Sequence, residues 1–117
     1  MPQSRRHRAS LAQEKIDLHL PNDGVEHGFT ICQDAHGDFV KGPEAVGTHL
    51  SVSIDVKCPA GYRPTGLFHT HPGGETKPSP TDIKSARRLG ISQLCIGVPE
   101  TGEVACHNVS KRCGRQR

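Results

Sequence analysis

The chain has 117 residues, a hydrophobic fraction of 32% and a net charge of +3, which suits one domain with one modest core. Three Phe, one Tyr and no Trp leave too few aromatic side chains for a single-strand nucleic-acid platform. No apolar run approaches the ~20 residues of a membrane-spanning helix. We therefore expect a partner other than nucleic acid or a membrane.

Basic residues gather at the two ends of the chain, in "SRRHR" (4–8) and "KRCGRQR" (111–117). We expect residues 1–10 to form a disordered basic arm and residues 111–117 a solvated basic tail. A single domain would then occupy residues 11–110. Weak contact of the two ends with nucleic acid or an anionic surface is the alternative.

The five cysteines are Cys32, Cys58, Cys95, Cys106 and Cys113. Their number is odd and no CxxC occurs, which argues against a disulfide framework and against a thiolate zinc site. The N-terminus also lacks the apolar stretch of a secretory signal. We expect reduced cysteines in a cytoplasmic protein, with one bridged pair left open.

The first half of the chain is predicted to form strands. Residues 11–21 are ambiguous, and alternating apolar residues favour a strand in their second half. A strand is expected over 25–34, followed by a tight turn over 34–38 that suggests a hairpin. The clearest alternation lies over 50–56, the pattern of a half-buried strand.

The second half contains one helix between strands. The short apolar run 65–71 predicts a central strand that ends in two histidines. A helix should begin after the N-cap Ser79 and end at Gly90. Further strands are expected over 91–99 and 103–109. This order predicts an α/β fold of the layered α+β kind.

A candidate metal site lies where the central strand meets the helix. His69 and His71 are two residues apart on a strand, so their imidazoles point to the same face. Asp82 falls in the first turn of the helix, where a carboxylate is favoured. Two His and one Asp leave a fourth zinc position open for water. Taken alone, Ser79 and Asp82 are also explained as a capping box.

The stretch "HTHPGGETKPSPTD" resembles the JAMM motif of zinc metalloproteases, also called MPN+ or JAB, which runs H-x-H-P, a short loop and S-x-x-D. The match covers His69, His71, Pro72, Ser79 and Asp82. The resemblance implies a mixed β-sheet flanked by helices, as in cytidine deaminases, over roughly 25–109. It also implies one zinc ion per chain, bound by His69, His71 and Asp82.

The same resemblance implies hydrolysis of a peptide or isopeptide bond. The family takes its general base from a glutamate on an earlier strand. We expect this to be Glu26, with Glu44 as the alternative. Ser79 would stabilise the developing oxyanion. Substrates would be proteins or peptides, with the tails of ubiquitin-like or sulfur-carrier proteins as candidates.

Three other functions compete with hydrolysis of a peptide bond. Non-catalytic MPN-type scaffolds usually lose ligands, whereas His69, His71, Ser79 and Asp82 are all present. A DNA-repair-associated JAB-like protein would use the basic ends, although the scarcity of aromatic residues argues against this role. A metal phosphoesterase would need more His and Asp ligands downstream, where only His107 follows Asp82 among histidines.

Overall fold

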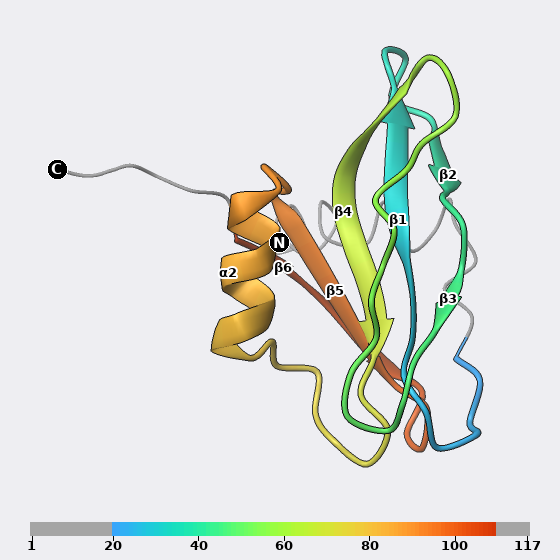
Figure 1. Ribbon diagram of the computed structural model, residues 1–117, viewed down its shortest axis with the longest axis vertical. Coiled ribbons are helices and arrows are strands. Elements are labelled where there is room, and N and C mark those ends of the chain that lie inside the picture. Colours follow the sequence, from blue (N-terminus) through green and yellow to red (C-terminus); the bar gives the residue numbers. More distant parts are fainter. Residues whose placement is uncertain (1–19, 110–117) are drawn as a thin grey trace, which may run out of the picture.

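The computed structural model describes residues 20–109, which form a mixed six-stranded sheet and one helix (Figure 1). The strands lie in the order β2-β1-β4-β5-β6, and β3 pairs with β1. The elements are β1 (His27–Asp34), β2 (Phe39–Lys41), β3 (Ala45–Val46), β4 (Tyr62–Thr70), α2 (Pro80–Arg88), β5 (Gln93–Val98) and β6 (Glu103–Asn108). The predicted mixed α+β fold is confirmed, and so is the hairpin of β1 and β2.

Strands β4 and β5 are parallel, whereas the other pairs in the sheet are antiparallel. Parallel neighbours need a crossover connection, and α2 with the loop before it supplies this connection. The helix begins as predicted at Ser79, whose Oγ accepts a hydrogen bond from the Asp82 N–H at 3.0 Å. It ends before Gly90, which has a φ of +74°.

Apolar side chains pack on both faces of the sheet. Alternation along β4 sends Leu67 toward α2 and Phe68 to the opposite face. The cluster on the α2 face consists of Leu67, Ala86, Ile91, Leu94, Ile96 and Val109. The cluster on the opposite face consists of Phe29, Ile31, Phe68 and Cys95. The crossover helix α2 thus packs on the sheet face to which the odd-numbered residues of β4, such as Leu67, point.

The strand predicted over 50–56 is wrong. These residues, here called the wall segment, belong to no strand: Leu50 lies in a bend and 51–56 have no regular secondary structure. After β3 they run along the face of the sheet, in front of β1 and β4 in the view of Figure 1, before the chain enters β4. Ile54 packs on Gly28, where an added Cβ would lie 2.7 Å from the Ile54 Cδ1. The alternation of apolar and polar residues has a structural basis, because Ile54 and Val56 pack on the α2-face cluster. It reflects side-chain packing on a sheet face rather than backbone pairing with a neighbouring strand.

Two disulfides join Cys32 to Cys58 and Cys95 to Cys106, so the expectation of reduced cysteines is wrong for these four residues. Cys95 and Cys106 are register partners on β5 and β6. Cys58 follows the wall segment and is bonded to β1. Tertiary structure creates both pairs, which is why the cysteine spacing did not reveal them. The disulfides remove one argument for the predicted cytoplasmic location, because disulfides persist mainly in oxidising compartments.

Several expectations concern residues outside the described range. These are the basic arm (1–10), the basic tail (111–117), most of the ambiguous strand before Pro21, and Cys113. Within residues 20–109, no helix is long and apolar enough to cross a lipid bilayer.

The two disulfides should contribute unequally to stability, because they close loops of different length. The separations are 26 residues for Cys32–Cys58 and 11 for Cys95–Cys106. Chain entropy predicts losses in unfolding free energy of about 3.5 and about 2.8 kcal/mol for the respective double Cys→Ala variants. Urea denaturation would measure both losses. Unchanged midpoints in both variants, relative to the oxidised chain, would contradict the expectation.

Candidate metal centre

The two histidines of the predicted site lie at the end of the central strand β4. His69 pairs in register with Gly28 of β1 and Ile96 of β5, and His71 follows directly after the strand. Both side chains point to the face that α2 covers. The His69 side chain is 8% exposed and that of His71 is 19% exposed. The buried end of β4 therefore holds both imidazoles and leaves one side of the imidazole pair accessible.

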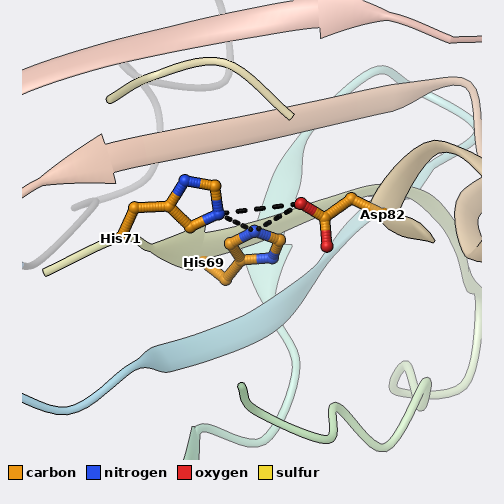
Figure 2. Close-up of side chains that lie close together, drawn as sticks. All are labelled: His69, His71 and Asp82. Atoms are coloured by element: carbon orange, nitrogen blue, oxygen red, sulfur yellow. Dashed lines mark hydrogen bonds and ion pairs between the residues drawn. The ribbon is translucent and has the colours of Figure 1, made fainter. Parts of the chain in front are cut away.

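The side chains of His69, His71 and Asp82 converge on one point (Figure 2). The Nε2 atoms of the histidines lie 3.0 Å apart, and the Asp82 Oδ2 lies 3.5 Å from His69 Nε2 and 3.6 Å from His71 Nε2. Ligands about 2.0–2.1 Å from a tetrahedral zinc ion are separated by about 3.3 Å. The three distances bracket this value, so the donor atoms fit a zinc ion with one further position open.

Backbone and side-chain contacts of the crossover loop orient His71. Its Nδ1 lies 2.9 Å from the Glu75 carbonyl, so an Nδ1–H donates there and leaves the Nε2 lone pair for a metal. The Glu100 carboxylate accepts from the Gly73 N–H at 2.9 Å, and His107 Nε2 lies 2.7 Å from the Thr76 carbonyl. Sequence reasoning missed these supporting residues, because Glu100 and His107 lie far along the chain from the loop.

Charges in the site act strongly on one another. Burial raises the pKa of Asp82, but the His69 and His71 imidazoles and the Ser79 N–H together hold that pKa well below its usual range. The Asp82 carboxylate raises the pKa of His71, although burial opposes this effect. Without a metal, the site therefore favours an ionised carboxylate beside a histidine that protonates readily. A cation is the natural occupant of such a site.

Glu26 lies immediately before β1, beside the end of β4. Continuing the register from the pair of Gly28 and His69 brings Glu26 opposite His71, on the same face of the sheet. The Glu26 N–H donates to the Thr48 carbonyl at 2.7 Å. Glu26 is 8% exposed, and burial raises its pKa, while the His69 and His71 charges act in the opposite direction. The carboxylate is thus close enough to sense the charges of the candidate ligands.

The other two predicted site residues differ in their placement. Ser79 lines the same cavity as His69 and Asp82, and its hydroxyl oxygen caps α2. The Glu44 carboxylate accepts from Lys41 Nζ at 2.9 Å, and Glu44 lines a small pocket together with Phe29 and Phe68, which point away from the α2 face. The arrangement favours Glu26 over Glu44 as the carboxylate that acts at the site.

A cavity of about 600 Å³ begins at the candidate ligands and runs between the wall segment and α2. It is lined by Leu50, Ser51, Val52, Ser53, Ile54, Val56, Leu67, His69, Ser79, Thr81, Asp82, Ser85, Arg88, Leu89 and Leu94. We call this cavity the groove. Its polar end holds the candidate ligands His69 and Asp82, and its middle is lined by aliphatic side chains.

Residues 8–109 match the family described as prokaryotic homologs of the JAB domain, and the chain belongs to this family. The structure is similar to the crystal structure of a JAB1/MPN domain protein from Archaeoglobus fulgidus. The identity is 16%, the match covers 92% of this chain and 90% of that chain, and the TM-score is 0.47. No curated protein matches the chain.

The chain should bind one zinc ion through His69, His71 and Asp82. Removing a ligand by His69→Ala or Asp82→Ala should lower zinc affinity by at least about 10-fold, because three donors converge on one position. Titration with zinc against a chromophoric chelator would measure the affinity. His36→Ala, in the exposed turn between β1 and β2, is the matched control. Equal zinc affinity in all four proteins would exclude the site.

Zinc affinity should fall as the pH falls, because a protonated imidazole cannot bind a metal. The pKa of His71 is raised above its ordinary value, so proton competition should begin at a higher pH than for an unperturbed histidine. Affinity should be greatest above this raised pKa and decline as the pH drops through it. Competition titrations between about pH 5 and 8 would follow the decline. An affinity that stays constant over that range would contradict this expectation.

Proposed function

We propose that the chain is a zinc-dependent metallopeptidase or isopeptidase. One observation carries this proposal: three zinc-type donors converge at one end of a groove, with a buried carboxylate immediately before the neighbouring strand. The donors are His69, His71 and Asp82, and the carboxylate is Glu26. Three protein ligands and an open fourth position are typical of catalytic rather than structural zinc.

A zinc ion bound there would lower the pKa of a water molecule and polarise a substrate carbonyl. Glu26 is the proposed general base that accepts the proton of this water and later passes it to the leaving amine. Burial raises its pKa, which brings the carboxylate closer to the range useful for proton transfer in both directions. Thr70 Oγ1 accepts from the His27 N–H at 2.9 Å, which fixes the backbone next to Glu26.

Ser79 is the proposed oxyanion donor. Its Oγ accepts from the Asp82 N–H, so the hydroxyl hydrogen is free to donate to a carbonyl oxygen that gains negative charge. Because the capping interaction fixes the side chain, the hydroxyl would need little reorganisation during the reaction. The same residue would therefore both start the helix and serve the reaction.

The proposed substrates are proteins or peptides whose chain lies extended in the groove, with the C-termini of ubiquitin-like or sulfur-carrier proteins as candidates. A non-catalytic MPN-type scaffold is the alternative. The complete ligand set and the buried Glu26 favour catalysis over that alternative, since a scaffold needs neither. A DNA-repair role would depend on the basic ends, which lie outside residues 20–109.

The variant Glu26→Gln tests the proposed mechanism. It should retain zinc, because the three ligands are unchanged, yet lower kcat by at least about 100-fold, since the amide cannot accept the proton. Cleavage of a ubiquitin-like fusion, a lysine-linked conjugate and a C-terminally extended carrier protein would be followed by mass spectrometry.

Glu44→Gln is the matched control, since it makes the same change on a carboxylate paired with Lys41. This variant should keep its activity. Turnover that survives in Glu26→Gln and is lost in Glu44→Gln would transfer the role of general base to Glu44. Cleavage at an unchanged rate after zinc removal would contradict the mechanism as a whole.

A further inference from the structure

The groove has charged groups at both ends. Asp82 belongs to the metal centre, while Arg88 lines the groove in the last turn of α2. Thr81, Ser85 and Leu89 line it as well, so one side of the helix faces the groove along its length. A ligand that reaches from the metal centre along this side would meet an arginine at the far end.

The Arg88 guanidinium is available to a ligand. Among residues 20–109, no carboxylate, carbonyl or ring partner contacts it, and its side chain is exposed. The neighbouring Arg87 is already used, since its Nε donates to the Val109 carbonyl at 3.0 Å. A cation in the last turn also suits the helix dipole, and Arg87 meets that need equally well. The position of Arg88 in the groove therefore calls for a separate explanation.

The spacing between the metal centre and Arg88 corresponds to a short length of peptide. Asp82 and Arg88 are six residues apart on the helix, which corresponds to about 9 Å along its axis. An extended peptide advances about 3.3 Å per residue, so this distance spans about three residues. Between the two ends, the aliphatic side chains of Val52, Ile54 and Leu94 line the groove.

We propose that Arg88 is a specificity-determining residue that binds a carboxylate about three residues from the scissile bond of an extended peptide substrate. The intervening substrate residues would be aliphatic or small, to match the groove lining. A guanidinium pairs with a carboxylate through two parallel hydrogen bonds and repels a basic side chain. The groove thus selects an acidic tail and rejects one with Lys or Arg at that position. This inference rests on the proposed peptidase function and specifies its substrate class.

Fluorescein-labelled octapeptides of Gly, Ala and Val provide the test, with a single Glu, Gln or Lys placed at each position in turn. The full zinc-loaded chain should cleave the peptide with Glu three residues from the scissile bond about three- to fivefold faster in kcat/KM than the Gln peptide. The Lys peptide should be slower than both. The preference should weaken at roughly 1 M salt, because the pair is partly exposed to solvent.

Arg88→Glu should reverse the order and favour the Lys peptide. Lys84→Glu is the matched control, because it makes a charge reversal on the same helix at an exposed residue outside the groove lining. It should leave the ratio of Glu to Lys peptides unchanged. An unchanged ratio in Arg88→Glu, or an equal shift in both variants, would overturn the proposal.

Two further arms separate the possible outcomes. Octapeptides ending in an acid or an amide distinguish an α-carboxylate from a Glu side chain as the group that Arg88 binds. Fluorescence anisotropy with the Glu26→Gln chain measures binding without cleavage. Arg88-dependent binding of acidic peptides that are never cleaved would support the role of Arg88 and contradict the peptidase function. Cleavage without a charge preference would support the peptidase function and contradict the role of Arg88. If no peptide is bound or cleaved, both proposals are overturned.

Discussion

The parallel pairing of β4 with β5 is the constraint on which the site depends. Because parallel neighbours cannot be joined by a tight turn, the chain must leave the end of β4, cross the sheet face and return. The end of β4 holds His69 and His71, and the returning segment starts with the capped first turn of α2, which holds Asp82. One crossover therefore brings together three donors that lie within 14 residues of sequence, and contacts of the crossover loop with Glu100 and His107 support this arrangement.

Glu26 reaches the same point by a different route. It immediately precedes β1, and only the antiparallel register of β1 and β4 brings it beside the histidines. The ligand set is thus a local property of one β-loop-α unit, whereas the proposed base depends on long-range pairing. The separation has a chemical consequence: burial raises the pKa of the proposed base, Glu26, while Asp82 remains ionised. Two carboxylates in one site can therefore take different roles.

The sequence predicted local features well and tertiary ones poorly. Ser79 and Gly90 revealed the helix, because capping and termination depend on neighbouring residues alone. The strand predicted over 50–56 failed, because alternation reports which side chains are buried and not what the backbone pairs with. The disulfides were missed for a related reason: Cys32 and Cys58 meet only after the wall segment has folded across the sheet.

The contact between Gly28 and Ile54 has a consequence for how wide a side chain the groove accepts. The wall segment approaches the sheet this closely because Gly28 has no side chain, and any Cβ there would press on Ile54 and on the Phe68 carbonyl. The position of the wall segment beside the groove is therefore set by a residue that lies beneath it on the sheet and does not line the groove. A side chain at position 28 would displace the wall segment and so change the size selectivity of the groove, with every candidate metal ligand left in place.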